Sequence, residues 1–269
     1  MSLKFVPLDA PFGAEGPNID LAAIGEGEFA EIKQAVMRHA LVLFRRQSLS
    51  DEDLAILTER FGPAEVPANH RALSPVTPHV VYISNMKDES GRPIGGGASE
   101  EMNWHADQSF RKNPATLSLL YAVVVPPERG HTYWCSTRLG YEALPDTLKG
   151  WVGEHRGTYL PGKNHQIDKV EVSHPLVLAM PDGSGNRLYV SSSTRGIEGM
   201  ADDESKARLE EILEHQLRPE HIYEHDWRVG DLMIYDNGQT LHRRDSFDGL
   251  RLMKGTRAFV SAEDFPVPN

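Results

Sequence analysis

The stretch GDLMIYDNGQTLHRR, from Gly230 to Arg244, carries the signals that indicate the fold. Its apolar run, Leu232–Tyr235, has the length and composition of a short buried strand. Asp, Asn and Gly follow directly, and these residue types favour a turn. The stretch therefore predicts a strand, a turn and then His242 on the segment that follows.

Similar strand signals recur along most of the chain. They are short runs rich in Val, Tyr, Leu and Thr, bounded by Gly, Pro and Asp: Leu41–Phe44, Val80–Ser84, Thr116–Val125, Thr132–Ser136, Arg187–Ser191 and Arg257–Ser261. Helices are predicted for a segment with Phe29, Ile32 and Val36 at helical spacing, a segment capped by Ser50, and the ranges Tyr141–Val152 and Asp202–Leu217. Strands outnumber helices and do not alternate with them regularly. The pattern predicts an antiparallel β core with helices packed outside it, and not a doubly wound parallel sheet.

Composition limits the class of protein. The chain has 269 residues, and its 28 Lys and Arg against 39 Asp and Glu give a net charge of −11. Such an acidic surface repels phosphate backbones and anionic lipid, so neither a nucleic-acid nor a membrane partner is expected. The single cysteine, Cys135, cannot form an internal disulfide and fits a small buried thiol in an apolar strand. Because no apolar run is long enough to cross a membrane and no signal-peptide pattern opens the chain, a cytoplasmic protein is expected.

The sequence Trp104-His-Ala-Asp107 carries the first chemical signal. On a strand, His105 and Asp107 point to the same face because only one residue separates them. An imidazole and a carboxylate on one face are two of the three ligands of a facial triad, which leaves the opposite side of an Fe(II) ion open. A hydrogen-bonded His–Asp pair at a strand end is the alternative. The third ligand has to come from a neighbouring strand, and His242 is the candidate.

Two arginines follow His242 on a segment that has the character of a strand. Residues 251, 253, 255 and 257 share one face of a strand, so Arg251 and Arg257 can both point inward. A guanidinium inside a β core is costly unless it pairs with an anion. A dicarboxylate cosubstrate would supply that anion through a bidentate contact.

Together these motifs resemble those of the taurine dioxygenase / 2,4-dichlorophenoxyacetate dioxygenase family of Fe(II)- and 2-oxoglutarate-dependent oxygenases. The resemblance rests on Asn103–Asp107, Gly130–Trp134, Gly230-Asp231, Tyr235–Asn237, His242 and Arg251, which match the family's motifs in order and approximate spacing. It implies that His105, Asp107 and His242 bind the iron. It also implies that Thr132 and Arg251 hold the distal carboxylate of 2-oxoglutarate.

The chain departs from the family pattern at the arginines. Arg251 follows His242 by nine positions, slightly fewer than in the family, so Arg257 is a second candidate for the contact with 2-oxoglutarate. Relatives often have a further arginine four residues after the first, where it meets the anionic group of the substrate, and Gly255 stands there. His70 lies where relatives often place a substrate-contacting histidine. Arg257 and His70 are therefore the expected substrate contacts.

The resemblance also implies a fold and a reaction. The fold is mainly β with flanking α, a double-stranded β-helix (jelly-roll) core in a single oxygenase domain that spans residues 1–269. The reaction uses Fe(II), 2-oxoglutarate and O₂ to hydroxylate or oxidatively cleave a small, acidic organic molecule, with succinate and CO₂ as co-products. The expected partner is this small-molecule substrate, and a homo-oligomer stays open.

Other interpretations of the same residues stay open at this point. A zinc-dependent hydrolase or lyase could use the same His/Asp/His set, although it needs no inward arginine. A non-catalytic jelly-roll binding protein would leave the set idle. His221 and His225, followed by Asp226, could coordinate a metal by themselves. His131 is a poorer ligand candidate, because it points to the strand face opposite Thr132.

Overall fold

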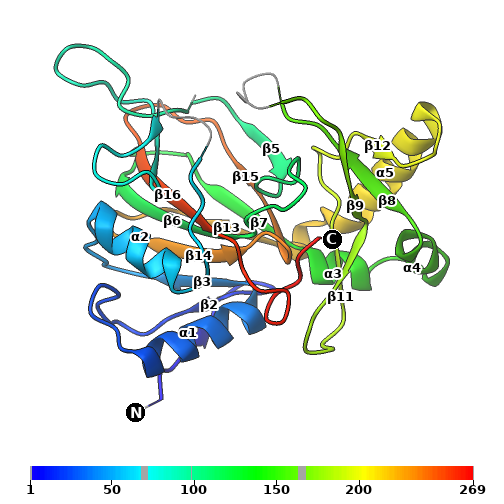
Figure 1. Ribbon diagram of the computed structural model, residues 1–269, viewed down its shortest axis with the longest axis horizontal. Helices are drawn as coiled ribbons and strands as arrows, with labels where there is room; N and C mark the ends of the chain where they lie inside the picture. The colour runs from blue at the N-terminus through cyan, green and yellow to red at the C-terminus, as the bar shows by residue number, and fades with distance from the viewer. Residues whose placement is uncertain (1, 68–71, 98, 163–167, 269) are drawn as a thin grey trace.

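Two β-sheets stack face to face in the computed structural model, which describes residues 2–67, 72–97, 99–162 and 168–268 (Figure 1). The larger sheet contains, in spatial order, β1 (Val6–Pro7), β2 (Ala14–Glu15), β3 (Leu41–Phe44), β14 (Leu232–Asp236), β6 (Leu117–Val124), β16 (Leu252–Ala258) and β4 (Val81–Ser84). The smaller sheet contains β13 (Ile222–His225), β7 (Thr132–Ser136), β15 (Thr240–Arg244) and β5 (Met102–His105). Neighbouring strands are antiparallel except for β2 and β3.

Successive core strands alternate between the two sheets, except that β7 and β13 both belong to the smaller one. Strands β4, β6, β14 and β16 belong to the larger sheet, whereas β5, β7, β13 and β15 belong to the smaller one. This order along the chain produces a double-stranded β-helix, that is, a jelly roll of two stacked sheets without closure into a barrel. The predicted mainly β core is therefore confirmed.

Strand β14 shows why the core strands read as continuous apolar runs. Leu232 and Ile234 face outward into a cluster with the N-terminal helices, whereas Met233 and Tyr235 face inward between the sheets. Alternate residues of a strand point to opposite faces, so a strand covered on both sides is apolar at every position. Inward residues of both sheets, among them Trp134 of β7, form the cluster that joins them.

Helices cover the outside of this core (Figure 1). The N-terminal α1 (Glu26–His39) and α2 (Asp51–Glu59) pack on the larger sheet. On the other side lie α3 (Thr137–Glu142), α4 (Asp146–Gly153), α5 (Asp202–Gln216), the 3₁₀ turn η2 (Pro219–His221), the hairpin β10 (Val177–Ala179) and β11 (Asn186–Leu188), and the sheet of β12 (Gly196–Ile197), β8 (Arg156–Tyr159) and β9 (Val172–Pro175). Within the described ranges, no helix is both long and apolar enough to cross a membrane.

Three predicted boundaries were wrong. The predicted helix Tyr141–Val152 is two helices, because Pro145 interrupts it and precedes the first residue of α4. The last strand is Leu252–Ala258 instead of Arg257–Ser261, and the chain leaves it after Ala258. The predicted strand Arg187–Ser191 shortens to β11, which ends at Leu188.

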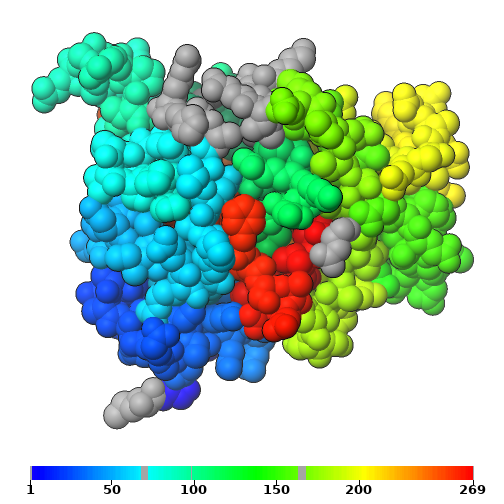
Figure 2. All heavy atoms as spheres, viewed as in Figure 1, coloured from blue at the N-terminus to red at the C-terminus, as the bar shows by residue number. Residues whose placement is uncertain are grey.

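The turn between β14 and β15 depends on close contact with the end of the chain. A Cβ atom at Gly238 would overlap the carbonyl oxygen of Pro266. The residue before Pro266, Phe265, is fully buried in the cluster under α1 and α2. Figure 2 shows the C-terminal residues, in red, filling the surface between the cyan and green parts of the chain.

Gly238→Ala is expected to lower the free energy of unfolding by about 1–3 kcal/mol. The new Cβ would overlap the backbone carbonyl of Pro266, which cannot move aside as the tip of a flexible side chain can. Urea denaturation measures this change. The control is Gly27→Ala in the exposed first turn of α1, where a Cβ would meet nothing within 4 Å. That variant should be unchanged or more stable by up to about 1 kcal/mol, because alanine restricts the unfolded chain. Equal stability of the two variants would contradict the contact with Pro266.

Candidate active site

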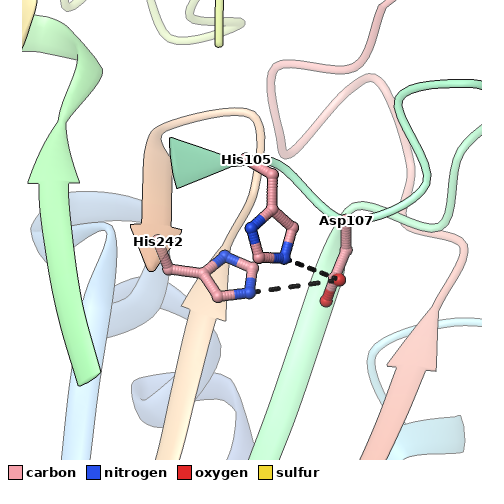
Figure 3. A group of neighbouring side chains, drawn as sticks. All are labelled: His105, Asp107 and His242. Atoms are coloured by element: carbon pink, nitrogen blue, oxygen red, sulfur yellow. Dashed lines mark ion pairs between the residues drawn. The ribbon is translucent and has the colours of Figure 1, made fainter. Parts of the chain in front are cut away.

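Three side chains converge between the sheets, as Figure 3 shows. His105 is the last residue of β5 and lies directly opposite His242 on β15, with ring centroids 4.1 Å apart. Asp107 lies two residues beyond the end of β5, so His105 and Asp107 do not share a strand face as predicted. Instead, a turn after β5 brings the Asp107 carboxylate toward the two histidines. Its Oδ1 is 3.9 Å from Nε2 of His105 and 4.0 Å from Nε2 of His242.

Local hydrogen bonds orient the His105 ring and fix the backbone of Asp107. Nδ1 of His105 lies 2.8 Å from the carbonyl oxygen of Asn103 and donates to it, which leaves Nε2 to face Asp107. The backbone N–H of Asp107 donates to the side-chain oxygen of Asn237 at 2.9 Å. Asn237 stands in the turn between β14 and β15 and also donates to the hydroxyl of Ser118 on β6. The turn after β14 therefore fixes the backbone of Asp107.

The buried histidine and the carboxylate have the protonation states that a metal requires. Burial and then the neighbouring His105 lower the pKa of His242 to about 3, so its imidazole is neutral. Burial raises the pKa of Asp107, but the positive charge of Arg257 outweighs burial and holds this pKa well below its usual range. Metal ligands must be deprotonated, and both groups meet that condition at neutral pH.

This donor set fits a divalent metal ion. The ligand atoms of His105, Asp107 and His242 lie within 4.8 Å of one another, and metal bonds to such atoms are about 2 Å long. Two imidazoles and one carboxylate are typical of non-heme Fe(II) oxygenases. In the part of the chain that the structure describes, no other group of three or more His, Cys, Asp or Glu side chains is this close.

Arg251 lies just before β16 and has an unusual environment. Only 3% of it is exposed, and its Nε has no hydrogen-bond partner among the described residues. Burial, and then the like charge of Arg244, lower its pKa to about 9. The guanidinium carbons of both arginines lie near the ring centroid of Phe247, at 4.9 Å for Arg244 and 5.6 Å for Arg251. A buried cation next to a second cation favours a bound anion.

Thr132 lies close to this arginine pair. It is buried on β7 directly opposite Arg244 of β15, and its hydroxyl accepts a hydrogen bond from the indole of Trp227 at 2.8 Å. Its own proton is therefore available to a further acceptor. Sequence reasoning missed Arg244, although its position two residues after His242 places it on the same face of β15.

The remaining candidates lie elsewhere or have other partners. Arg257 on β16 points inward as predicted but contacts Asp107, with Nε 3.0 Å from Oδ2. His225 pairs with buried Asp231 at 3.0 Å. His131 pairs with Glu224 and, at 3.5 Å, with Asp226, and His221 bonds the carbonyl of Gln216 at the end of α5; these pairings show no second metal site. His70 lies outside the described residues.

Comparison with known proteins identifies relatives over nearly the whole chain. The family "Taurine catabolism dioxygenase TauD, TfdA family" matches residues 4–257. The alpha-ketoglutarate-dependent 2,4-dichlorophenoxyacetate dioxygenase of Cupriavidus pinatubonensis is 32% identical, over 92% of this chain and 94% of that protein. An (S)-phenoxypropionate/alpha-ketoglutarate-dioxygenase of Sphingobium herbicidovorans is 28% identical over 92% of this chain and 91% of that protein.

Solved structures give the same result. A taurine dioxygenase from Burkholderia xenovorans superimposes with a TM-score of 0.83 at 29% identity, covering 97% of this chain and 92% of that one. AAD-2 in complex with Mn(II) and N-oxalylglycine matches with a TM-score of 0.83 at 27% identity, covering 97% of this chain and 98% of that one. The fold, the His-Asp-His group and these matches show that the chain belongs to the TauD/TfdA family of Fe(II)- and 2-oxoglutarate-dependent dioxygenases.

Proposed function

We propose that this dioxygenase hydroxylates, or oxidatively cleaves, a small organic acid, with succinate and CO₂ as co-products. The observation that carries the proposal is the pairing of two sites in the interior between the sheets. One is the His105/Asp107/His242 group, and the other is Arg251, a buried cation without a hydrogen bond to its Nε among the described residues. A metal site alone would fit a zinc hydrolase equally well, whereas the arginine site fits the second carboxylate of 2-oxoglutarate.

In this proposal the side chains bind and orient. His105, Asp107 and His242 hold Fe(II), which when bound supplies the activation of O₂ for oxidation of a C–H bond. Arg251 receives the distal carboxylate of 2-oxoglutarate, and the Thr132 hydroxyl donates to the same group. The apolar cluster between the sheets, with Met253 and Trp134 among its members, keeps water from the reacting groups.

The substrate class follows from the relatives. Those named for 2,4-dichlorophenoxyacetate and for (S)-phenoxypropionate act on small aryloxy acids. We propose a small acid for this chain as well. Of the two substrate contacts that the sequence predicts, we retain His70, whereas the Arg257 guanidinium is already bonded to Asp107. We further propose that residues 1–269 act as one oxygenase domain in the cytoplasm, which agrees with a family match over 4–257 and with a single, buried cysteine.

The test is a turnover assay on a panel of small aryloxy and aliphatic acids. Purified protein is supplied with Fe(II), 2-oxoglutarate and ascorbate, and O₂ consumption and succinate release are measured for each acid. One acid at least should raise both rates together, and substitution of Zn(II) for Fe(II) should abolish them. Hydrolysis of a panel compound with Zn(II), without consumption of 2-oxoglutarate, would contradict the proposal.

A further inference from the structure

Arg257 makes two hydrogen bonds to the predicted metal ligand Asp107. Its Nε lies 3.0 Å from Oδ2 and its Nη2 lies 3.2 Å from Oδ1. Ser118, directly opposite Arg257 on the neighbouring strand β6, donates its hydroxyl to the same Oδ2 at 3.0 Å. Oδ2 therefore accepts two hydrogen bonds from the larger sheet, whereas Oδ1 faces the two histidines of the smaller sheet.

A second carboxylate holds Arg257 from the other side. Nη1 of Arg257 lies 3.6 Å from Oε2 of Glu65, which is 2% exposed. The backbone N–H of Glu65 donates to the carbonyl oxygen of Arg257 at 2.8 Å, so both the backbone and the side chain of Glu65 are tied to this arginine. Oε1 of Glu65 accepts from Gln108 and lies 3.3 Å from Nη2 of Arg111.

The result is a row of alternating charges: Asp107, Arg257, Glu65 and Arg111. The guanidinium of Arg257 lies between two carboxylates, which compensate its positive charge. An anionic substrate would have to compete with both of them, and each is ionic and largely desolvated. The geometry of Arg257 therefore suits the support of Asp107 better than the binding of a substrate.

We propose that Arg257 is a positioning residue, which turns Asp107 so that Oδ1 meets the metal, and that it is not the receptor for the acid group of the substrate. This inference rests on the proposed metal site at His105, Asp107 and His242. Residues that hydrogen-bond a metal-binding carboxylate or histidine set its orientation, and their loss typically lowers metal affinity by about 10- to 100-fold. Removal of the positive charge alone would act in the opposite direction and tighten metal binding.

The experiment measures Mn(II) binding to the purified full-length chain by calorimetric titration, without substrate. Arg257→Ala should weaken Mn(II) binding by about 10- to 100-fold, and Arg257→Lys, which can keep the charge and one hydrogen bond, should lie between this variant and the wild type. The matched control is Arg111→Ala, which removes an arginine from the same Glu65 without touching Asp107. Its Mn(II) affinity should stay within about twofold of the wild type.

Thermal unfolding of the metal-free variants separates positioning from stability. Arg257→Ala with a lower unfolding midpoint but wild-type Mn(II) affinity would overturn the inference, as would tighter Mn(II) binding. If Arg257→Ala does not fold, Arg257→Lys and Arg257→Gln decide by the same measurement. Failure of the proposed function gives a different result: the wild-type chain binds Mn(II) but consumes no 2-oxoglutarate with Fe(II).

Discussion

Asp107→Ala is expected to stop Fe(II)-dependent turnover, with succinate formation reduced by about 1000-fold or more. The substitution removes the one anionic member of the His-Asp-His group and leaves Arg257 facing an empty space on that side. Both effects weaken metal binding. The metal loses its negatively charged ligand, and the positive charge of Arg257, which Asp107 no longer compensates, repels the metal cation. The measurement is succinate release at saturating 2-oxoglutarate over a range of Fe(II) concentrations.

The control for this variant is Asp226→Ala. The Asp226 side chain is 81% exposed, and its Oδ1 lies 3.5 Å from Nε2 of His131. Its removal should leave succinate formation unchanged. Full activity of Asp107→Ala would refute the assignment of the metal site, and loss of activity in both variants would point to a general effect of charge.

Arg251→Ala is expected to raise the apparent constant for 2-oxoglutarate by roughly 30- to 1000-fold, corresponding to about 2–4 kcal/mol. The physical reason is the loss of the charged donor from a desolvated carboxylate. Arg251→Lys should recover part of the affinity, because the charge remains but the planar fork is lost. Binding of 2-oxoglutarate is measured directly on the Mn(II)-loaded protein.

Arg257→Ala provides the comparison, measured at Mn(II) concentrations that saturate its weakened site. The apparent constant of this variant for 2-oxoglutarate should change far less than that of Arg251→Ala, because the Arg257 guanidinium is already paired with Asp107 and Glu65. If Arg257→Ala loses 2-oxoglutarate and Arg251→Ala does not, the roles of the two arginines are exchanged, and a separation of nine positions from His242 to Arg251 is the wrong spacing for this contact.

Strands β3, β6 and β14 were predictable because each is covered on both faces and is therefore apolar at nearly every position. Strands without such an apolar run were not. Strand β8 contains Arg156 and Thr158, and its partner β9 contains Ser173 and His174, so neither shows an apolar run or a clean alternation. Such short, mixed segments become strands through pairing and packing, which local sequence does not encode.

The alternation of side chains along a strand predicted that Arg251 and Arg257 point inward, but it could not show which groups they contact. Arg257 and Asp107 are 150 positions apart in the chain, and Glu65 reaches Arg257 from the segment after α2. These partners depend on how β5, β6 and β16 stack. The convergence of His105 with His242, in contrast, was expected from the motifs, because the resemblance placed both on the same metal.

Strand β16 places strict limits on how this enzyme can diversify. Arg251 precedes the strand, and Met253, Gly255 and Arg257 follow at every second position of its inward face. An insertion or deletion of one residue would turn Arg257 away from Asp107 or Arg251 away from the interior, because a shift by one position reverses the face. Substitution at Gly255 leaves this register intact, and the nearest neighbour of a Cβ there would be the flexible tip of Ile83, at 3.3 Å. Evolution or design can therefore exchange the side chain at Gly255 while the length of the strand, and with it the direction of both arginines, stays fixed.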